Sequence, residues 1–355
     1  MFYLKTLYLN QFRQFTSETL EFSPHVNIIY GPNAVGKTTI IEAINALALC
    51  QSFRTSKDNE MIQYNKDYCF AKGLFIEETN KVNEHNIVFS LSNEGKRIKK
   101  DEKTFAKLSE YIGYYKTVVF SPQDLELVQG APAVRRKFMD LYLCQIDGEY
   151  LNSSIKYRKW LKERNELFKN ESIDQALMKI ITDNLIKEGL VLTHKRQEFI
   201  QNINTILKEK MSIINNQEEV AIQYIPSYNQ EDYLDYIYET NYEHDRLTQS
   251  THVGPHHDDL KFKINGMDAM AFASQGQQRS IVLALKSAVS AYLSLDERII
   301  VAFDDVFSEL DEARQQAILK LIGEDNQVFL TTASEKLVEN LSTSGGKLIK
   351  IGGKL

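Results

Sequence analysis

The sequence is 355 residues long, which is enough for roughly two domains. Hydrophobic residues make up 43% and charged residues 25%, a balance typical of a globular protein that buries a substantial core. The net charge of −6 argues against binding to acidic polymers through overall charge, so any nucleic-acid contact requires a local basic patch. The three cysteines are scattered without a C-x-x-C pair, and they indicate neither a disulfide framework nor a zinc site.

The hydrophobic runs of the chain indicate whether it is secreted or spans a membrane. The first ten residues lack the layout of a secretory signal peptide. The sequence also contains no run of about 18 uncharged apolar residues, the length that a membrane-spanning helix requires. We therefore expect a cytoplasmic protein that has no membrane segment.

The N-terminal part of the chain predicts strands that lead into a nucleotide-binding loop. Alternating or β-prone residues predict strands over 2–9, 18–22 and 26–30. An apolar stretch with small residues predicts a helix over 39–49. The pattern G-x-x-x-x-G-K-[ST] occupies residues 31–38, between the third strand and this helix. The motif therefore stands in the strand–loop–helix context that it requires.

Such a loop directs its backbone N–H groups at a phosphate, and the N-terminus of the following helix adds a positive dipole end. Lys37 would reach the β- and γ-phosphates, and the hydroxyl of Thr38 would ligate Mg²⁺. The candidate nucleotide-binding residues are Gly31, Pro32, Asn33, Ala34, Val35, Gly36, Lys37, Thr38 and Thr39. Arg13, in the loop ahead of the motif, is compatible with covering a base or a phosphate and equally with a plain surface loop.

The next segment carries a cluster of basic residues. Strands are predicted over 68–76, 86–92 and 117–120. The basic cluster follows a hairpin turn and consists of Lys96, Arg97, Lys99 and Lys100. These side chains could contact DNA phosphates, but a solvated edge strand protected by lysine is the commoner meaning of such a cluster.

The spacing of apolar residues becomes typical of helices from about residue 125 to residue 245. Apolar spacing predicts helices over 133–144 and 151–168, and a third long helix that includes Leu177 to Ile206. We interpret residues 125–245 as an inserted helical domain. The first of these helices begins with three basic residues that are candidate DNA contacts: Arg135, Arg136 and Lys137.

After residue 245 the sequence again predicts alternating strands and helices. The predicted elements are a strand over 260–264, a helix over 280–293, a strand over 298–303, a helix that opens at 308–311 and a last strand over 327–331. The histidines and aspartates between His252 and Asp259 resemble a metal cluster. However, adjacent residues on a strand point to opposite faces, so these residues cannot all meet one ion. Hydrogen bonding that braces the fold is the favoured role.

Two acidic residues follow the apolar strand at 298–303. The C-terminal ends of strands line the ligand crevice of an open α/β sheet, so we expect Asp304 to hold Mg²⁺ together with Thr38. Asp305 points the other way and could orient or deprotonate the attacking water.

A second predicted anion-binding end lies at residues 274–279, Ser-Gln-Gly-Gln-Gln-Arg, directly before a helix. Because Lys37 already supplies one phosphate cradle, Ser274 and Gly276 would cap the γ-phosphate bound by another subunit, in a two-fold interface. An ordinary helix N-cap is the alternative.

Together these motifs resemble the ABC-type ATPases. Residues 31–38 match the Walker A motif, 274–278 the signature motif, 304–305 the Walker B motif and 308–311 the D-loop. Further stretches resemble the RecF family of bacterial recombination mediators, and the similarity covers essentially the whole chain. These stretches are Ser121-Pro122-Gln123-Asp124-Leu125, Gly130-x-Pro132-x-x-Arg135-Arg136, Gly254-Pro255-His256-x-Asp258-Asp259-Leu260 and Ser274 to Arg279.

The resemblance implies an α/β fold, with an ABC-type ATPase head made of a P-loop core and an antiparallel β subdomain. Residues 1–124 and 246–355 would form the head, and residues 125–245 a mainly helical arm. Such a protein dimerises when ATP and Mg²⁺ bind, is a weak DNA-stimulated ATPase, and recognises duplex, gapped or junction DNA. In DNA replication, repair and the SOS response it works with RecR and RecO to load RecA onto strands coated by single-strand binding protein.

The resemblance also assigns roles to individual residues. Lys37 and Thr38 would bind phosphate and Mg²⁺, and Asp304 would bind Mg²⁺. Asp305 takes the place of the catalytic carboxylate. Gln123 takes the place of the Q-loop residue that senses the γ-phosphate and the metal, and Ser274, with Gly276 and Gln277, acts on the partner's nucleotide.

Four positions depart from the pattern. ABC-type ATPases usually place Glu at position 305, and transporter ATPases place a His where this chain has Thr331 to Ser334. Gln123 is Glu in many RecF-like sequences, and His257 stands where Arg is common. Since Asp305 reaches less far toward water than Glu, we expect weak turnover, with ATP used as a conformational switch.

Two other classes explain fewer of these features. A transporter ATPase would have the missing His and only a short segment between the Walker A and signature motifs, whereas here Lys37 and Ser274 are separated by 237 positions (274 − 37). A small-molecule kinase would need a substrate pocket and lid arginines, and it leaves the signature motif unexplained.

Overall fold

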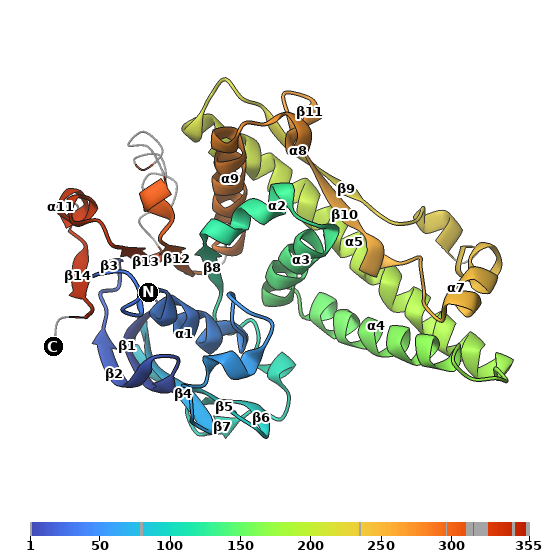
Figure 1. Ribbon diagram of the computed structural model, residues 1–355, viewed down its shortest axis with the longest axis horizontal. Helices are drawn as coiled ribbons and strands as arrows, with labels where there is room; N and C mark the ends of the chain where they lie inside the picture. Colours follow the sequence, from blue (N-terminus) through green and yellow to red (C-terminus); the bar gives the residue numbers. More distant parts are fainter. Residues whose placement is uncertain are drawn as a thin grey trace. The chain divides into compact units, whose positions relative to one another are not determined.

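The chain forms two compact units, which are described separately here (Figure 1). The computed structural model describes residues 2–78, 81–233, 236–295, 297–309, 315, 326–342 and 345–352. The first unit comprises Met1–Asp124 and Leu283–Leu355, and the second comprises Leu125–Val282. The second unit thus begins at the same residue as the predicted insertion, but it extends to Val282, whereas the predicted insertion ends at residue 245.

A five-stranded parallel sheet forms the centre of the first unit. Its strands are β3 (Val26–Tyr30), β8 (Thr117–Phe120), β12 (Ile300–Asp304), β13 (Gln327–Thr332) and β14 (Lys347–Lys350). Their order is β14-β3-β13-β12-β8, and every neighbouring pair is parallel. Every residue of β8, β12 and β13 is buried, as expected for strands covered on both faces.

A six-stranded antiparallel sheet is the second layer of this unit. Its strands are β1 (Phe2–Phe12), β2 (Phe15–Glu21), β4 (Tyr68–Glu78), β5 (Val82–Ser92), β6 (Gly95–Lys100) and β7 (Lys103–Thr104), in the order β2-β1-β4-β5-β6-β7. The helix α1 (Lys37–Leu49) contacts strands of both sheets. Every residue of α1 except Thr38 is buried, which explains why apolar residues occupy most of its positions.

The second unit is mainly helical. Its helices are α2 (Glu126–Gln129), α3 (Pro132–Ile146), α4 (Gly148–Leu167), α5 (Gln175–Ile214), α7 (Tyr242–Thr248) and α8 (Ala269–Phe272). The carboxylates of Asp147 and Asp174 cap α4 and α5 by accepting hydrogen bonds from the first-turn N–H groups. Within the described residues, no helix is both long and apolar enough to cross a membrane.

The helical unit also contains a three-stranded antiparallel sheet. Its strands are β9 (Val220–Ile225), β10 (Asp259–Ile264) and β11 (Met267–Asp268), and β10 lies in the middle. Two further helices belong to the C-terminal part of the chain: α9 (Gln275–Leu293), which continues from the second unit into the first, and α11 (Glu335–Ser342). The helix α9 was predicted to begin at residue 280, but it begins at Gln275 and so includes the signature residues that follow Ser274.

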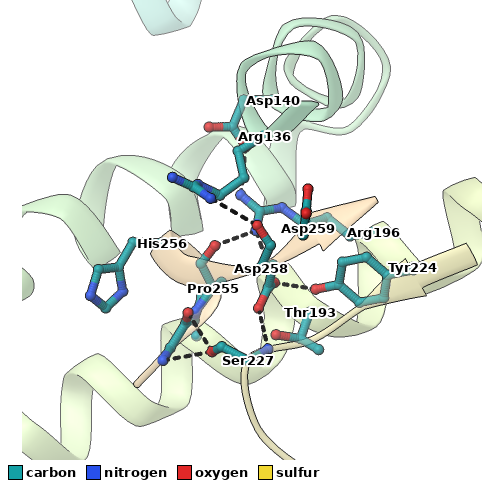
Figure 2. Close-up of polar contacts among 12 residues, drawn as sticks. Arg136, Asp140, Thr193, Arg196, Tyr224, Ser227, Pro255, His256, Asp258 and Asp259 are labelled. Carbon is teal, nitrogen blue, oxygen red and sulfur yellow. Dashed lines mark hydrogen bonds and ion pairs between the residues drawn. The ribbon is translucent and has the colours of Figure 1, made fainter. Parts of the chain in front are cut away.

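A buried polar network joins the strand β10 to the helices of the second unit (Figure 2). The guanidinium of Arg196 lies 3.0 Å from a carboxylate oxygen of Asp258 and 2.9 Å from one of Asp140, and it donates to the carbonyl of Pro255 at 2.6 Å. Asp258 is fully buried and also accepts from the hydroxyl of Tyr224 and the N–H of Ser227. The segment that begins with Gly254 and Pro255 is thus anchored by hydrogen bonds within its own unit.

Removing the Asp258 carboxylate is predicted to destabilise the second unit strongly. In the Asp258→Ala variant, the buried charge of Arg196 would lose one of its carboxylate partners. Removing one partner of a buried ion pair costs about 3–5 kcal/mol in proteins. Urea unfolding followed by circular dichroism measures the loss. The matched control is Glu163→Ala, which removes an exposed pair with Lys159 and is expected to cost less than about 1 kcal/mol. Equal losses in the two variants would contradict this account.

His256 predicts how stability depends on pH. Burial lowers the pKa of His256 from its usual 6.5 to about 4, so the folded protein holds the neutral ring. The hydroxyl of Tyr157 lies 2.6 Å from its Nδ1, and the carbonyl of Thr251 lies 2.8 Å from its Nε2. A neutral ring satisfies both contacts by accepting at Nδ1 and donating at Nε2.

Between pH 6.5 and pH 4 the unfolded chain binds a proton at this position that the folded chain does not bind. The contribution of His256 to stability is therefore complete above pH 6.5 and declines as the pH falls toward 4. We expect the free energy of unfolding of wild type to fall more steeply over this window than that of His256→Gln. Urea unfolding at half-unit pH steps measures both slopes, and parallel slopes would refute the assignment.

Candidate functional site

The P-loop connects β3 to α1 and has the backbone geometry of a phosphate-binding turn. Gly31 has φ = 154° and Gly36 has φ = 108°, conformations that residues with a side chain rarely adopt. Space is also short, because a Cβ at Gly36 would overlap the side chains of Gln14 and Phe15. Ala34 adopts a left-handed conformation with φ = 67°. The predicted glycine positions are thus required by the turn itself.

Lys37 lies across this loop. Its ammonium donates hydrogen bonds to the carbonyls of Gly31 at 2.8 Å and of Pro32 at 2.7 Å. Burial lowers the pKa of Lys37, and the negative charges of Asp305 and Asp304 oppose that shift. The loop therefore holds one cation close to its own carbonyls and beside two acidic residues. The ammonium of Lys37 is thus already positioned in the loop to which an anionic group would bind.

Thr38 and Asp304 lie within hydrogen-bond distance although one lies in the first turn of a helix and the other ends a distant strand. The hydroxyl of Thr38, at the start of α1, donates to Asp304 Oδ1 at 2.8 Å. Asp304 ends β12 and is only 6% exposed, and burial raises the pKa of its carboxyl group. A hydroxyl and a carboxylate oxygen are hard ligands of the kind that Mg²⁺ prefers. The donor set brought together here therefore fits a magnesium ion.

Asp305 directly follows Asp304 and has an unusual backbone conformation. Its φ is 53°, in the left-handed region that residues other than glycine rarely adopt. Its N–H donates to the hydroxyl of Thr331 at 2.9 Å. Thr331 lies on β13, directly beside Asp304 in the parallel sheet. No role in the site was predicted for Thr331, which entered the sequence comparison only as part of the segment where transporter ATPases place a His.

The structure gives Arg13 a partner other than a nucleotide. Its guanidinium forms two hydrogen bonds with Glu42 of α1, at 2.9 and 2.6 Å. The Glu42 side chain is fully buried and also accepts from Ser52 and Arg54. Arg13 thus neutralises a buried carboxylate of α1. Thr39 likewise donates its hydroxyl to Gln14, at 2.9 Å, so this contact joins the start of α1 to the loop that carries Arg13.

Gln123 lies in a short 3-10 turn, η3 (Pro122–Leu125), at the end of β8, and its side chain is exposed. The neighbouring Asp124 accepts from the N–H of Ser121 at 2.7 Å and pairs with the ammonium of Lys286 at 2.8 Å. These contacts fix the turn that presents Gln123. The pairing of Asp124 with a buried lysine of α9 was not expected from the sequence.

The signature residues form a capping box in the second unit. The hydroxyl of Ser274 accepts from the N–H of Gln277 at 3.3 Å, and the side chain of Gln277 accepts from the N–H of Ser274 at 2.8 Å. Gln277 also donates to Glu218 at 3.0 Å. The side chain of Ser274 is exposed, and Gly276 lies in the first turn of α9. In the predicted D-loop, Leu310 and Asp311 lie outside the described residues.

Two of the three basic residues at the start of α3 are engaged inside their unit. Arg135 is buried and forms two hydrogen bonds with the carboxylate of Asp259, at 2.6 and 3.0 Å. Arg136 donates to the carbonyl of Asp258 at 2.9 Å, as Figure 2 shows. Lys137 is exposed. Lys137 is thus the most exposed residue of this group, and Arg136 is half-buried.

The basic residues of β6 lie among acidic and aromatic partners. Their contacts are Lys96 with Asp58 at 2.7 Å, Arg97 with Glu94 at 2.6 Å, Lys99 with Glu102 at 3.3 Å, and Lys100 over the ring of Tyr114 at 4.5 Å. Arg97 is the most exposed of the three paired cations, with a side-chain exposure of 69%. Because exposed pairs are weak, Arg97 and Lys99 can exchange these partners for phosphates.

Comparison with known proteins assigns the chain to a family. A family model described as "RecF/RecN/SMC N terminal domain" matches residues 3–351. Proteins named "DNA replication and repair protein RecF" are 34% identical in Staphylococcus epidermidis, over 98% of both chains, and 37% identical in Streptococcus pneumoniae, over 96% of both chains. A solved structure of "the recombination mediator protein RecF-ATP in RecFOR pathway" superposes with a TM-score of 0.87 at 32% identity, covering 94% of this chain and 92% of that one.

These matches agree with the observed architecture. The fold is that of an ABC-type ATPase head with an inserted helical part. The head consists of the parallel sheet with its P-loop and the antiparallel sheet, which both contact α1, and the inserted part is the mainly helical unit. By its sequence over nearly the whole length and by this fold, the chain belongs to the RecF family.

Proposed function

We propose that this chain is an ATP-dependent, DNA-binding recombination mediator. The observation that carries the proposal is the contact between Thr38 and Asp304, which joins the P-loop to the buried acidic strand end. The name and ATP-bound state of the solved RecF structure, and the replication and repair names of the relatives, support the same role.

In the proposed cycle the residues of the P-loop bind the phosphates of ATP, and Lys37 moves from the carbonyls of Gly31 and Pro32 to the phosphate oxygens. Thr38 and Asp304 would hold Mg²⁺, which would neutralise charge on the phosphates. Asp305 orients the attacking water. Its short side chain, and the absence of His between Thr331 and Ser334, support slow hydrolysis.

ATP binding would also join two copies of the chain. Ser274 and Gly276 lie at the N-terminus of α9, where N–H groups and the helix dipole favour an anion. We infer that they contact the γ-phosphate held by the P-loop of a second copy, which gives a two-fold dimer. The exposed Ser274 side chain supports this role.

The proposed DNA contacts are electrostatic. The exposed Lys137 and the weakly paired Arg97 and Lys99 are the candidates among the described residues, and each would contact phosphates without reading bases. Gapped or junction DNA would then be recognised by its shape. Cooperation with RecR and RecO is inferred from the RecFOR pathway named for the solved RecF structure, and loading of the recombinase RecA is what membership of the RecF family implies.

The Ser274→Arg variant tests the shared nucleotide site. We expect wild type to be a dimer with ATP and Mg²⁺, and the variant to remain a monomer while still binding ATP, because the large cation occupies the space of the partner's phosphate. Solution mass by light scattering, with and without duplex DNA, measures the result. Ser212→Arg, at an exposed serine of α5, is the control and should dimerise. A wild type that stays monomeric at saturating ATP, with DNA present, would refute the dimer.

A salt titration tests the electrostatic contact. If Lys137 neutralises one duplex phosphate, Lys137→Ala should reduce the slope of log K against log salt by about 0.9. Binding of labelled duplex DNA at several salt concentrations, with ATP and Mg²⁺ present, gives the slope. The control Lys208→Ala removes an exposed lysine of the same unit and should leave the slope unchanged. Identical slopes for Lys137→Ala and wild type would exclude Lys137 from the interface.

A further inference from the structure

The hydroxyl of Thr331 occupies a junction between the proposed metal ligand and the proposed catalytic carboxylate. It lies 3.0 Å from Asp304 Oδ1 and 3.4 Å from the carbonyl of Phe303. A hydroxyl has one hydrogen, and the shorter contact to a carboxylate takes it. The same oxygen accepts the N–H of Asp305 at 2.9 Å. Thr331 itself is 1% exposed, so water does not compete for these bonds.

The sheet places this hydroxyl where it can act on both halves of the site. β13 lies between β3, which leads into the P-loop, and β12, which ends in Asp304. Thr331 pairs with Ile29 of β3 on one side and with Asp304 of β12 on the other. The hydroxyls of Thr331 and Thr38 both donate to the same oxygen of Asp304. If Thr38 turned its oxygen to a metal, Thr331 would still orient the carboxylate.

The hydroxyl of Thr331 also contacts the backbone of Asp305, whose conformation is unusual. A φ of 53° lies in the left-handed region, which residues other than glycine seldom adopt and aspartate adopts more readily than most, so contacts around the residue help to hold it there. The bond from the Asp305 N–H to Thr331 is one such restraint. It fixes the direction in which the Asp305 side chain leaves the strand end.

We propose that Thr331 is a positioning residue that orients Asp304 for Mg²⁺ and fixes the turn that carries Asp305. The inference rests on the proposed function of the P-loop site. Partners that orient metal ligands typically change metal affinity or activity by about 10–100-fold when they are removed. Thr331 thus couples the affinity for the metal to the placement of the catalytic carboxylate through one hydroxyl group.

The test compares Thr331→Val, which replaces the hydroxyl with a methyl group of similar size, with Thr331→Ser, which keeps the hydroxyl. Binding of a fluorescent ATP analogue is titrated with Mg²⁺ and repeated in EDTA, and the kcat and KM of ATP hydrolysis are measured. We expect Thr331→Val to raise the half-saturating Mg²⁺ concentration about tenfold or more and to lower kcat more than KM rises. Analogue affinity in EDTA should stay within about twofold of wild type, and Thr331→Ser should restore the Mg²⁺ titration.

Thr332→Val is the matched control, because Thr332 is fully buried on the same strand and its hydroxyl accepts from the N–H of Ser334 at 3.0 Å. It should leave the Mg²⁺ titration unchanged. Thr331→Ala removes the hydroxyl without adding a methyl group beside Asp304, and it must reproduce the Thr331→Val defect.

The outcomes separate this inference from the function on which it rests. If wild type binds ATP with Mg²⁺ and Thr331→Val titrates with Mg²⁺ as wild type does, the inference is overturned and the proposed function stands. If Thr331→Ser is as defective as Thr331→Val, the hydroxyl group alone does not support the Mg²⁺ titration, which also overturns the inference. A wild type that binds no ATP would overturn the proposed function, and the inference with it.

Discussion

The hydrogen bond between Thr38 and Asp304 joins segments that lie 266 positions apart in the chain. It can form only because β3 and β12 lie in one parallel sheet with a single strand, β13, between them. The carboxyl ends of parallel strands meet at one edge, so the P-loop after β3 and the acidic end of β12 face the same space. The sheet order thus determines the site, and the helix α1, buried against both sheets, fixes where the P-loop ends.

The second unit depends on charges that are buried and paired. Arg196 and Asp258 are both almost fully buried, and so are Arg164 and Asp245, whose charged groups lie 2.8 Å apart. Removing such charges from water is expensive, and their mutual attraction offsets that cost only where the geometry is good and further hydrogen bonds are made. Here the partners come from α3, α4, α5, α7 and the segment before β10. We interpret this network as the feature that specifies how these helices pack on the three-stranded sheet.

Local sequence signals predicted the elements whose periodicity matches their burial. The P-loop strand, α1, α3, α4, α5 and β12 appear close to their predicted positions because each carries an apolar run or a helical apolar stripe. β9 was not predicted, although Val220 and Ile222 are buried and the residues between and after them are more exposed, because a six-residue alternation is a weak signal inside a helical region. β14 is shorter still, with four residues, and it pairs with β3, a strand from the other end of the chain.

In the site, too, local motifs predicted some residues, whereas the roles of others depend on contacts between distant parts of the chain. The residues of the P-loop and Asp304 were identified because spacing and chemistry specify them. The position of Arg13 left a nucleotide contact and a plain surface loop open, and its pairing with the buried carboxylate of Glu42 could not be predicted from either alternative. Thr331 could not be found from the sequence, since its role depends on the strand order, which places β13 between the two motifs. Side chains that serve a site through a neighbour are identified by geometry alone.

The sequence left two roles open for Ser274, a helix cap or a contact with a partner's phosphate, and the observed geometry makes them compatible. The cap uses the hydroxyl oxygen as an acceptor, for the N–H of Gln277. Accepting a hydrogen bond does not consume the hydroxyl's own hydrogen, which can be donated to a phosphate oxygen at the same time. The capping box holds the side chain in place at an exposed helix N-terminus, where the helix dipole favours an anion. A serine at this position therefore loses little conformational entropy when a phosphate arrives, because its orientation is already set by the fold.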